Sequence, residues 1–219
     1  MGSLKLTVLG ASGGVGRLLV EQAAKRGHEV VAVARPSSSV SAPSGVTVMK
    51  GDLESEAFLR ECVRGRDVVL SALGLKLQGL APWNKPERPD FLRASTDALI
   101  AAMKAEGVRR VCAVSSGGVG DSADIIPGFF KMFVAMSAMK RVFVELDAME
   151  QKYFQSGLEV CVVRPSGLTD EPATGKVVVT KKFTGRATIS RADVAAYMLD
   201  QAEKSAFTER SPVITVTGG

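Results

Sequence analysis

Short apolar runs alternate with longer amphipathic stretches along most of the chain. A brief apolar run bounded by glycine or polar residues is typical of a buried strand, whereas apolar residues three and four positions apart predict a helix with one buried face. The expected strands span residues 4–9, 28–35, 46–49, 67–72, 108–115, 158–164 and 213–216. The expected helices span residues 17–26, 54–64, 90–105 and 131–155, the last being one long helix or two, and a further helix begins at Ser190. This alternation predicts an α/β, Rossmann-like fold with a doubly wound parallel sheet, formed as a single domain over residues 1–219.

Long connections leave the predicted strands near residues 75–89, 117–130 and 166–190. Ligands of open α/β sheets bind at the carboxyl ends of the strands, so we expect these to be substrate-side loops. The alternative for the first two is that they are surface excursions covering apolar side chains. Within the third, residues 172–192 contain five lysines and arginines and no acid. This basic segment either attracts an anionic substrate or, as we favour, forms an exposed, solvated hairpin.

A glycine-rich turn joins the first predicted strand to the first predicted helix. Its residues are Gly10, Ala11, Ser12, Gly13, Gly14, Val15 and Gly16. Gly10 allows the sharp turn, Gly13 lets the backbone approach a pyrophosphate, and Gly16 lets the helix pack closely on the strand. The first N–H groups of the helix then face the phosphates. In this strand–turn–helix context the motif predicts dinucleotide binding, the alternative being a turn with a purely structural role.

The end of the second predicted strand indicates which dinucleotide binds. Enzymes that use NAD carry an acid near this point, which holds the ribose 2′-hydroxyl. Here the strand ends in Ala34 and Arg35, and Ser37 and Ser38 follow. An arginine beside hydroxyl groups can bind a 2′-phosphate, which an acid would repel. We therefore expect NADP(H), with NADPH preferred over NADH; otherwise Arg35 lies on a solvated turn.

The composition is that of an ordinary globular protein. The 219 residues are 46% hydrophobic, and 28 basic and 23 acidic residues give a net charge of +5. Because the charges are mostly interspersed and aromatic residues make up only 5%, we expect no nucleic-acid partner. No apolar run is long enough to span a membrane, and the chain enters a strand too soon for a signal peptide. We expect a cytoplasmic protein with reduced cysteines, no metal and a small-molecule substrate, either a monomer or a weak homo-oligomer.

Several motifs together resemble one family along nearly the whole chain. They are Gly10-x-x-Gly13-x-x-Gly16, Arg35, Gly51-Asp52, Ala72-Leu73-Gly74, Ser115-Ser116, the segment from Ser156 to Gly175, and Ser190-Arg191-Ala192-Asp193-Val194-Ala195. With these motifs the chain resembles the atypical short-chain dehydrogenases/reductases, in the NAD(P)H-binding, NmrA-like and flavin- or biliverdin-reductase-like group. The spacing of the glycines, with two residues between each pair, is part of that resemblance.

The resemblance implies positions for the rest of the cofactor. Asp52 and Leu53 would border the adenine, although Asp52 can also serve as a helix N-cap. The residues expected along the ribose and pyrophosphate are Ala72, Leu73 and Gly74. The residues expected to flank the nicotinamide are Pro165, Ser166, Gly167 and Leu168.

Most short-chain dehydrogenases/reductases donate a proton from a tyrosine in a Tyr-x-x-x-Lys pair on one helix face. Here Met136 stands four residues before Lys140, and neither Tyr153 nor Tyr197 is followed by a lysine at that spacing. The usual acid is therefore missing. The candidate catalytic residues are Lys140, which either positions the cofactor or lies on the surface, and Ser115 and Ser116, which either orient the substrate or cap the strand end.

A cofactor site without the usual acid favours substrates that accept hydride directly. We expect an NADPH-dependent reductase acting on a planar conjugated small molecule of the flavin, quinone or tetrapyrrole type. The apolar residues from Phe129 to Met139 either wall a broad pocket or belong to the core. The alternatives are a dinucleotide-binding redox sensor without catalysis, and a carbonyl reductase or epimerase-like enzyme with an unusual acid.

Overall fold

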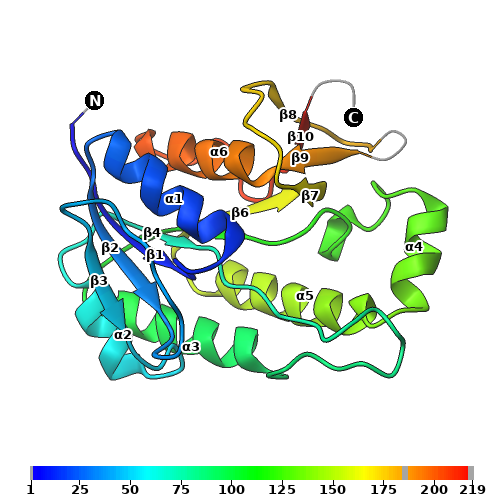
Figure 1. Cartoon of the computed structure of the whole chain (residues 1–219), viewed down its shortest axis with the longest axis horizontal. Coiled ribbons are helices and arrows are strands. Elements are labelled where there is room, and N and C mark those ends of the chain that lie inside the picture. The colour runs from blue at the N-terminus through cyan, green and yellow to red at the C-terminus, as the bar shows by residue number, and fades with distance from the viewer. Residues whose placement is uncertain (1, 184–186, 217–219) are drawn as a thin grey trace.

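A computed structural model describes residues 2–183 and 187–216. Its strands are β1 (Lys5–Leu9), β2 (Glu29–Ala34), β3 (Thr47–Lys50), β4 (Val68–Ser71), β5 (Arg110–Val114), β6 (Glu159–Pro165), β7 (Gly167–Thr169), β8 (Val177–Val179), β9 (Thr188–Ser190) and β10 (Val213–Val216). Eight of them form one sheet in the order β3-β2-β1-β4-β5-β6-β10-β8 (Figure 1). Neighbouring strands are parallel except for β8, which pairs antiparallel with β10. The predicted Rossmann-like α/β fold is confirmed.

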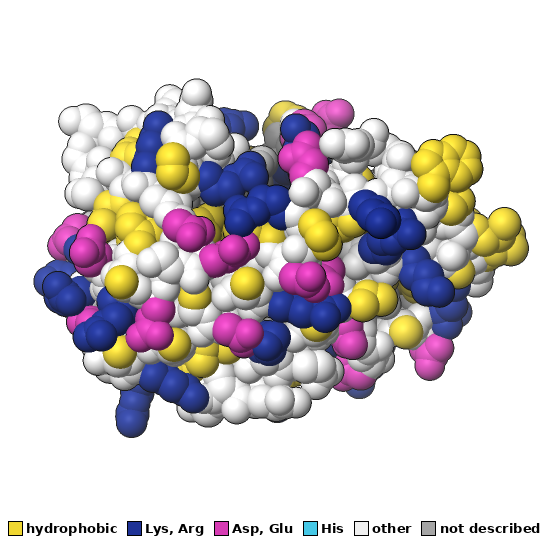
Figure 2. Space-filling view, turned by 90° about the horizontal axis from the view of Figure 1, so that it is seen from below, with side chains coloured by type: hydrophobic (Ala, Val, Ile, Leu, Met, Phe, Trp, Pro, Cys, Tyr) yellow, Lys and Arg dark blue, Asp and Glu magenta, His cyan; other side chains and the backbone are white. Residues whose placement is uncertain are grey.

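Helices cover both faces of the sheet. They are α1 (Gly14–Lys25), α2 (Glu56–Val63), α3 (Phe91–Ala105), α4 (Gly128–Ala135), α5 (Met139–Gln155) and α6 (Arg191–Glu203), with a short 3₁₀ helix, η1 (Gly120–Ser122). Helices α1 and α6 lie together above the sheet in Figure 1, and α2, α3 and α5 lie below it. Figure 2, which looks from below, shows positive and negative side chains interspersed over this second side.

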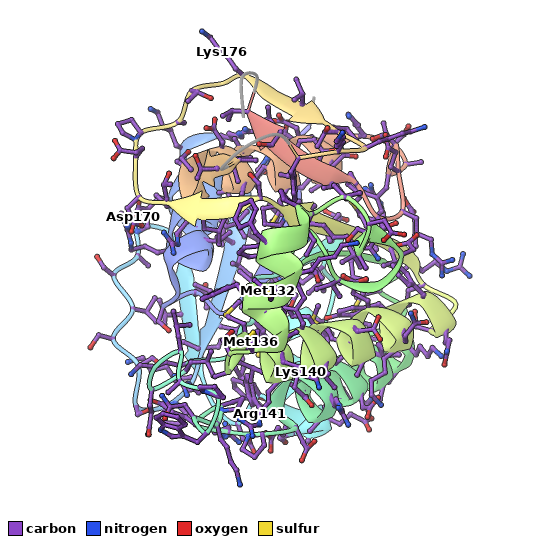
Figure 3. All side chains as sticks on the ribbon, turned by 90° about the vertical axis from the view of Figure 1, so that its right-hand side faces the viewer. Met132, Met136, Lys140, Arg141, Asp170 and Lys176 are labelled. Carbon is purple, nitrogen blue, oxygen red and sulfur yellow. The ribbon has the colours of Figure 1, made fainter. Side chains whose placement is uncertain are left out.

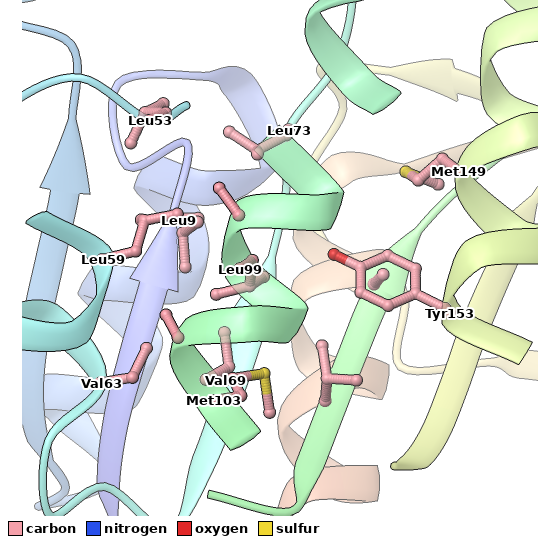
Figure 4. Packing of buried hydrophobic residues seen from close by; sticks show 14 of the residues in the cluster. Leu9, Leu53, Leu59, Val63, Val69, Leu73, Leu99, Met103, Met149 and Tyr153 are labelled. Carbon is pink, nitrogen blue, oxygen red and sulfur yellow. The ribbon is translucent and has the colours of Figure 1, made fainter. Parts of the chain in front are cut away.

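The sheet is buried on both faces because its side chains alternate between two apolar layers. Leu6 and Val8 of β1 pack with residues of α1 and α6. Leu9 packs in the opposite layer with residues of α2, α3 and α5, where Leu99 and Tyr153 are also buried (Figure 4). Burial on both sides explains why the strands read as apolar runs rather than as alternating patterns.

The strand order creates the crevice in which a ligand can bind. The chain builds β1, β2 and β3 outward in one direction and then returns to place β4 on the other side of β1. The connections that leave β1 and β4 therefore diverge to opposite sides at their carboxyl ends. Such a switch point is the usual ligand site of an open α/β sheet.

The structure decides one alternative that the sequence left open and corrects one prediction. The stretch 131–155 contains two helices, α4 and α5, rather than one. The helical hydrogen bonding is interrupted between them, where the Ala138 N–H donates to the Leu80 carbonyl at 3.1 Å. The prediction of an exposed hairpin at 172–192 is wrong, because β8 pairs with β10 and β9 pairs in parallel with β7. Residues 184–186 of that segment lie outside the described residues.

The start of α6 agrees with the predicted capping motif, since the Asp193 N–H donates to Ser190 Oγ at 3.0 Å. Within residues 2–183 and 187–216, none of the helices combines the length and the hydropathy that crossing a membrane requires.

Candidate functional site

The glycine turn packs so closely that two of its glycines, Gly10 and Gly16, cannot be replaced without a clash with backbone atoms. Gly10 has φ +77°, and a Cβ there would lie 2.6 Å from the Ala72 carbonyl oxygen. A Cβ on Gly16 would lie 2.0 Å from the carbonyl oxygen of Gly10. Gly13 is different: its nearest neighbour would be Gly10 O at 3.2 Å, and it lines an open pocket. The two outer glycines therefore shape the turn, and Gly13 presents its backbone to the pocket.

This pocket, named here the glycine-turn pocket, has a volume of about 120 Å³ and lies at the switch point. Its lining residues are Gly10, Ser12, Gly13, Ala34, Arg35, Leu53, Ala72, Leu73, Gly74, Leu75, Lys76, Glu87, Arg88 and Phe91. Helix α1 begins beside it with no acid in its first turn and no side-chain cap. The N–H groups at the start of α1, the helix dipole and the nearby cations together fit a phosphate-bearing dinucleotide.

Of the predicted cofactor residues up to Gly74, seven lie outside this lining: Ala11, Gly14, Val15, Gly16, Ser37, Ser38 and Asp52. Beyond Arg35, Ser37 is exposed and Ser38 is half-buried, and neither contributes to the pocket. Asp52 Oδ1 accepts from the Glu54 N–H at 3.0 Å. The interpretation of Asp52 as a helix N-cap is wrong, because Ser55 is the residue that caps α2.

The pocket also contains cations that the sequence reasoning did not assign to it. Lys76 and Arg88 come from the connection at 75–89, whose two arms are joined by a bridge between Leu77 and Pro86. Arg88 pairs with Glu54 at 2.8 Å and stacks over the Phe91 ring, 4.7 Å from its centroid. No local sequence pattern predicts the bridge between Leu77 and Pro86, so nothing in the sequence indicated that these two cations line the same pocket as Arg35.

A second cavity, named here the apolar pocket, lies at the carboxyl ends of β5 and β6 and has a volume of about 530 Å³. The predicted residues Ser115, Ser116, Pro165, Ser166, Gly167 and Leu168 all line it. They meet because the Ser115 N–H donates to Val163 O at 2.8 Å and the Gly117 N–H donates to Pro165 O at 2.9 Å. The rest of the lining is Gly117, Ile126, Pro127, Phe129, Phe130, Met139, Val142, Phe143, Leu146, Phe183, Ala187 and Thr188.

Two serine hydroxyls stand at the polar end of the apolar pocket. Ser115 Oγ is buried and has no hydrogen-bond partner among the described residues. Among the described residues, the one hydrogen-bond partner of Ser116 Oγ is the Gly117 carbonyl oxygen, at 3.3 Å. A buried hydroxyl without a partner is costly, so the Ser115 hydroxyl is available to a bound molecule.

The apolar stretch at 129–139 divides between pocket and surface. Phe129, Phe130 and Met139 line the apolar pocket. Met132 and Met136 face outward, with 62% and 68% of their surface exposed (Figure 3). Interpreting this stretch as core was therefore wrong for these two methionines.

Lys140 lies apart from both pockets. It is exposed in the first turn of α5 and faces a separate groove with Pro82, Lys85 and Arg141 (Figure 3). The spacing that grouped Met136 with Lys140 on one helix face does not apply, because Met136 follows the last residue of α4 and Lys140 belongs to α5. We therefore assign Lys140 no role beside Ser115 and Ser116.

Comparisons with known proteins agree with this geometry. The family model described as NAD(P)H-binding matches residues 10–205. Isoflavone reductase homolog P3 of Arabidopsis thaliana is 26% identical over 213 residues; the match covers 89% of this chain but only 63% of that relative.

Two solved structures are similar in fold. ChuY, an anaerobilin reductase of Escherichia coli O157:H7, has a TM-score of 0.78 at 23% identity, over 98% of each chain. A short-chain dehydrogenase/reductase of Veillonella parvula in complex with NADP has a TM-score of 0.79 at 16% identity, over 99% of this chain and 96% of that one. The match to the family model covers most of the sequence and includes the glycine turn, and it confirms the resemblance seen in the motifs. The chain belongs to the NAD(P)H-binding family.

Proposed function

We propose that the protein is an NADPH-dependent reductase that transfers hydride to a planar conjugated small molecule of the flavin, quinone or tetrapyrrole type. The observation that carries the proposal is the lining of the apolar pocket. Among the described residues around it, the polar side chains are Ser115, Ser116, Ser166 and Thr188, and none is ionisable near neutral pH. A conjugated acceptor suits such a pocket, because it spreads the added electrons over its ring system and needs no strong acid beside it.

The residues have separable roles in this proposal. The backbone of the glycine turn holds the diphosphate, and Arg35 binds the 2′-phosphate. Residues 165–168 border the nicotinamide and form one wall of the apolar pocket, so the donor and the acceptor meet there. The cofactor supplies a hydride, and the reduced acceptor takes its proton from water. Ser115 Oγ donates a hydrogen bond to the acceptor, and the surrounding aromatic and aliphatic side chains pack against its ring system.

The relatives support the same class of reaction. One solved structure of the same fold is described as an anaerobilin reductase, which favours a tetrapyrrole as the acceptor. A pocket of about 530 Å³ falls within the usual range for small-molecule sites.

The deciding experiment measures loss of NADPH absorbance against a panel of flavins, quinones and linear tetrapyrroles. Turnover of at least one of these, slowed when the transferable hydrogen of NADPH is deuterium, supports the proposal. Tight NADPH binding without turnover of any acceptor would favour a redox sensor. Turnover of simple carbonyl compounds alone would favour an enzyme with an unusual acid.

Neither tyrosine should matter for this turnover. Tyr153 belongs to α5 and is buried in the apolar layer that contains Leu9 and Leu99 (Figure 4), and Tyr197 lies on α6 at the other face of the sheet. Burial raises the pKa of both phenols, although the hydroxyls of Ser71 and Thr96 partly offset this for Tyr153. We expect Tyr153→Phe and Tyr197→Phe each to keep kcat/KM within about twofold. A loss of about 100-fold in either, the scale of general acid catalysis, would contradict the assignment.

Arg35 should determine the preference for NADPH. Arg35→Ala removes a charged hydrogen bond to the 2′-phosphate, which is worth about 1.5–3 kcal/mol or roughly 10- to 150-fold in Kd. NADH has no such phosphate, so its affinity should change by less than about threefold. Isothermal titration with both cofactors tests this, and Arg60→Ala, which removes an exposed arginine on α2, is the matched control. Equal affinity of the unaltered protein for NADPH and NADH would contradict the assignment.

A further inference from the structure

The packing of the turn explains why position 14 is glycine, which the spacing of the nucleotide-binding glycines does not require. The three spaced glycines are Gly10, Gly13 and Gly16, yet position 14 is glycine as well. A Cβ at Gly14 would lie 2.7 Å from Cδ and 2.8 Å from Nε of Arg191, and no atom outside that side chain comes within the same range. The stem of Arg191 thus runs directly over the backbone of Gly14, in the first turn of α1.

Arg191 occupies a place that is electrostatically poor for a cation. It is the first residue of α6, and it also lies against the first turn of α1. Both helix N-termini carry partial positive charge, which destabilises a nearby cation and favours an anion. α1 has no acid in its first turn to offset this.

The carboxylates around Arg191 compensate its charge only weakly. Its Nη1 donates to Asp170 Oδ1 at 2.9 Å, but the Asp170 side chain is 89% exposed and lies at the edge of the molecule just beyond β7 (Figure 3). An ion pair this exposed contributes little. Asp193, in the same first turn of α6, is already engaged, because it accepts hydrogen bonds from the N–H groups of Thr174 and Gly175 and from the Ser190 hydroxyl.

We propose that Arg191 binds the diphosphate of NADP(H) from the α6 side of the glycine turn, and that Asp170 is its counter-ion in the free protein. This inference rests on the proposed function, because it concerns the same cofactor. It gives the diphosphate a side-chain cation in addition to the backbone N–H groups of α1. It also explains Gly14, since any larger residue would displace the arginine stem.

The experiment measures Kd for NADP⁺ and for adenosine 2′-monophosphate, which keeps the adenosine and the 2′-phosphate but lacks the diphosphate. Arg191→Ala should weaken NADP⁺ about tenfold and leave adenosine 2′-monophosphate within about twofold. Arg35→Ala should weaken both ligands. Arg17→Ala is the matched control, because Arg17 lies on α1 in an exposed pair with Glu21, and its loss should change neither Kd by more than about twofold.

Gly14→Ala provides an independent test that keeps the arginine. Its methyl group must push the Arg191 stem aside, so this variant should weaken NADP⁺ about as much as Arg191→Ala. The double variant should be no weaker than either single one, because both changes remove the same interaction. Asp170→Asn should bind NADP⁺ as tightly as the unaltered protein or a few-fold more tightly, because it frees the arginine.

The outcomes separate this inference from the proposed function. Unchanged NADP⁺ affinity in Arg191→Ala, with the expected loss in Arg35→Ala, would overturn the role of Arg191 and leave the cofactor assignment standing. Additive losses in the Gly14→Ala and Arg191→Ala double variant would also overturn it. If the unaltered protein failed to bind NADP⁺ at all, both the proposed function and this inference would fall.

Discussion

Replacing Gly13 by valine should abolish binding of NADP(H) while the domain remains folded. Gly13 has more room than the glycines on either side of the turn: its Cβ position is 3.2 Å from Gly10 O and 4.0 Å from Ala72 O. The added side chain can therefore be accommodated by a small shift. It must project toward the glycine-turn pocket, which is only about 120 Å³ and is where the diphosphate would approach the backbone. We expect a loss of at least about 100-fold in NADP⁺ affinity, or roughly 3 kcal/mol.

Gly16→Val is the contrasting variant for this prediction. Its Cβ would lie 2.0 Å from a backbone oxygen, so the strand and α1 must separate and the free energy of unfolding should fall by several kcal/mol. Urea unfolding followed by circular dichroism, together with isothermal titration, distinguishes the two variants. A folded Gly13→Val protein with ordinary NADP⁺ affinity would show that the turn does not hold the cofactor.

The fold could be predicted from the sequence because its signals are local. Each buried strand of the parallel sheet is an apolar run, and turns such as the one at Gly10 are marked by glycine. The pairing of β8 with β10 is not local, and it was predicted wrongly as a hairpin within 172–192. Nothing in the residues from 177 to 179 specifies which distant strand they will join.

The positions of candidate site residues could be predicted where a recognisable motif directly follows a single predicted strand. The ends of β1 and β4 bring the glycine turn and Ala72 to one pocket, and the ends of β5 and β6 bring Ser115 and Pro165 to another. The sequence failed where distant segments meet. Lys76 and Arg88 reach the glycine-turn pocket because the 75–89 connection folds back on itself. Lys140 lines neither pocket, and the break between α4 and α5 removes the helix register on which its prediction depended.

Buried charges hold the two walls of the apolar pocket together. Arg164, at the end of β6, is 3% exposed and pairs with Glu150 of α5, which is fully buried, and with Asp121 of η1. Burial lowers the pKa of Arg164, but the hydrogen bonds to Glu150 and Asp121 more than offset this and raise it. Because an arginine side chain is not deprotonated in proteins, the guanidinium keeps its charge when a partner is removed. It joins the strand that leads into Pro165 to the 117–130 loop on the opposite wall.

Glu150→Gln should consequently cost about 3–5 kcal/mol of unfolding free energy, because it leaves a buried guanidinium with only the exposed Asp121 as its acid. Urea denaturation extrapolated to water measures this loss. Glu21→Gln, which breaks the exposed pair with Arg17, is the control and should cost less than about 1 kcal/mol. Replacing both buried partners, as in Glu150→Gln with Arg164→Met, should cost less than Glu150→Gln alone, because no unpaired charge then remains inside. A loss below about 1 kcal/mol in Glu150→Gln would mean that apolar packing, rather than this charge network, holds the pocket walls in place.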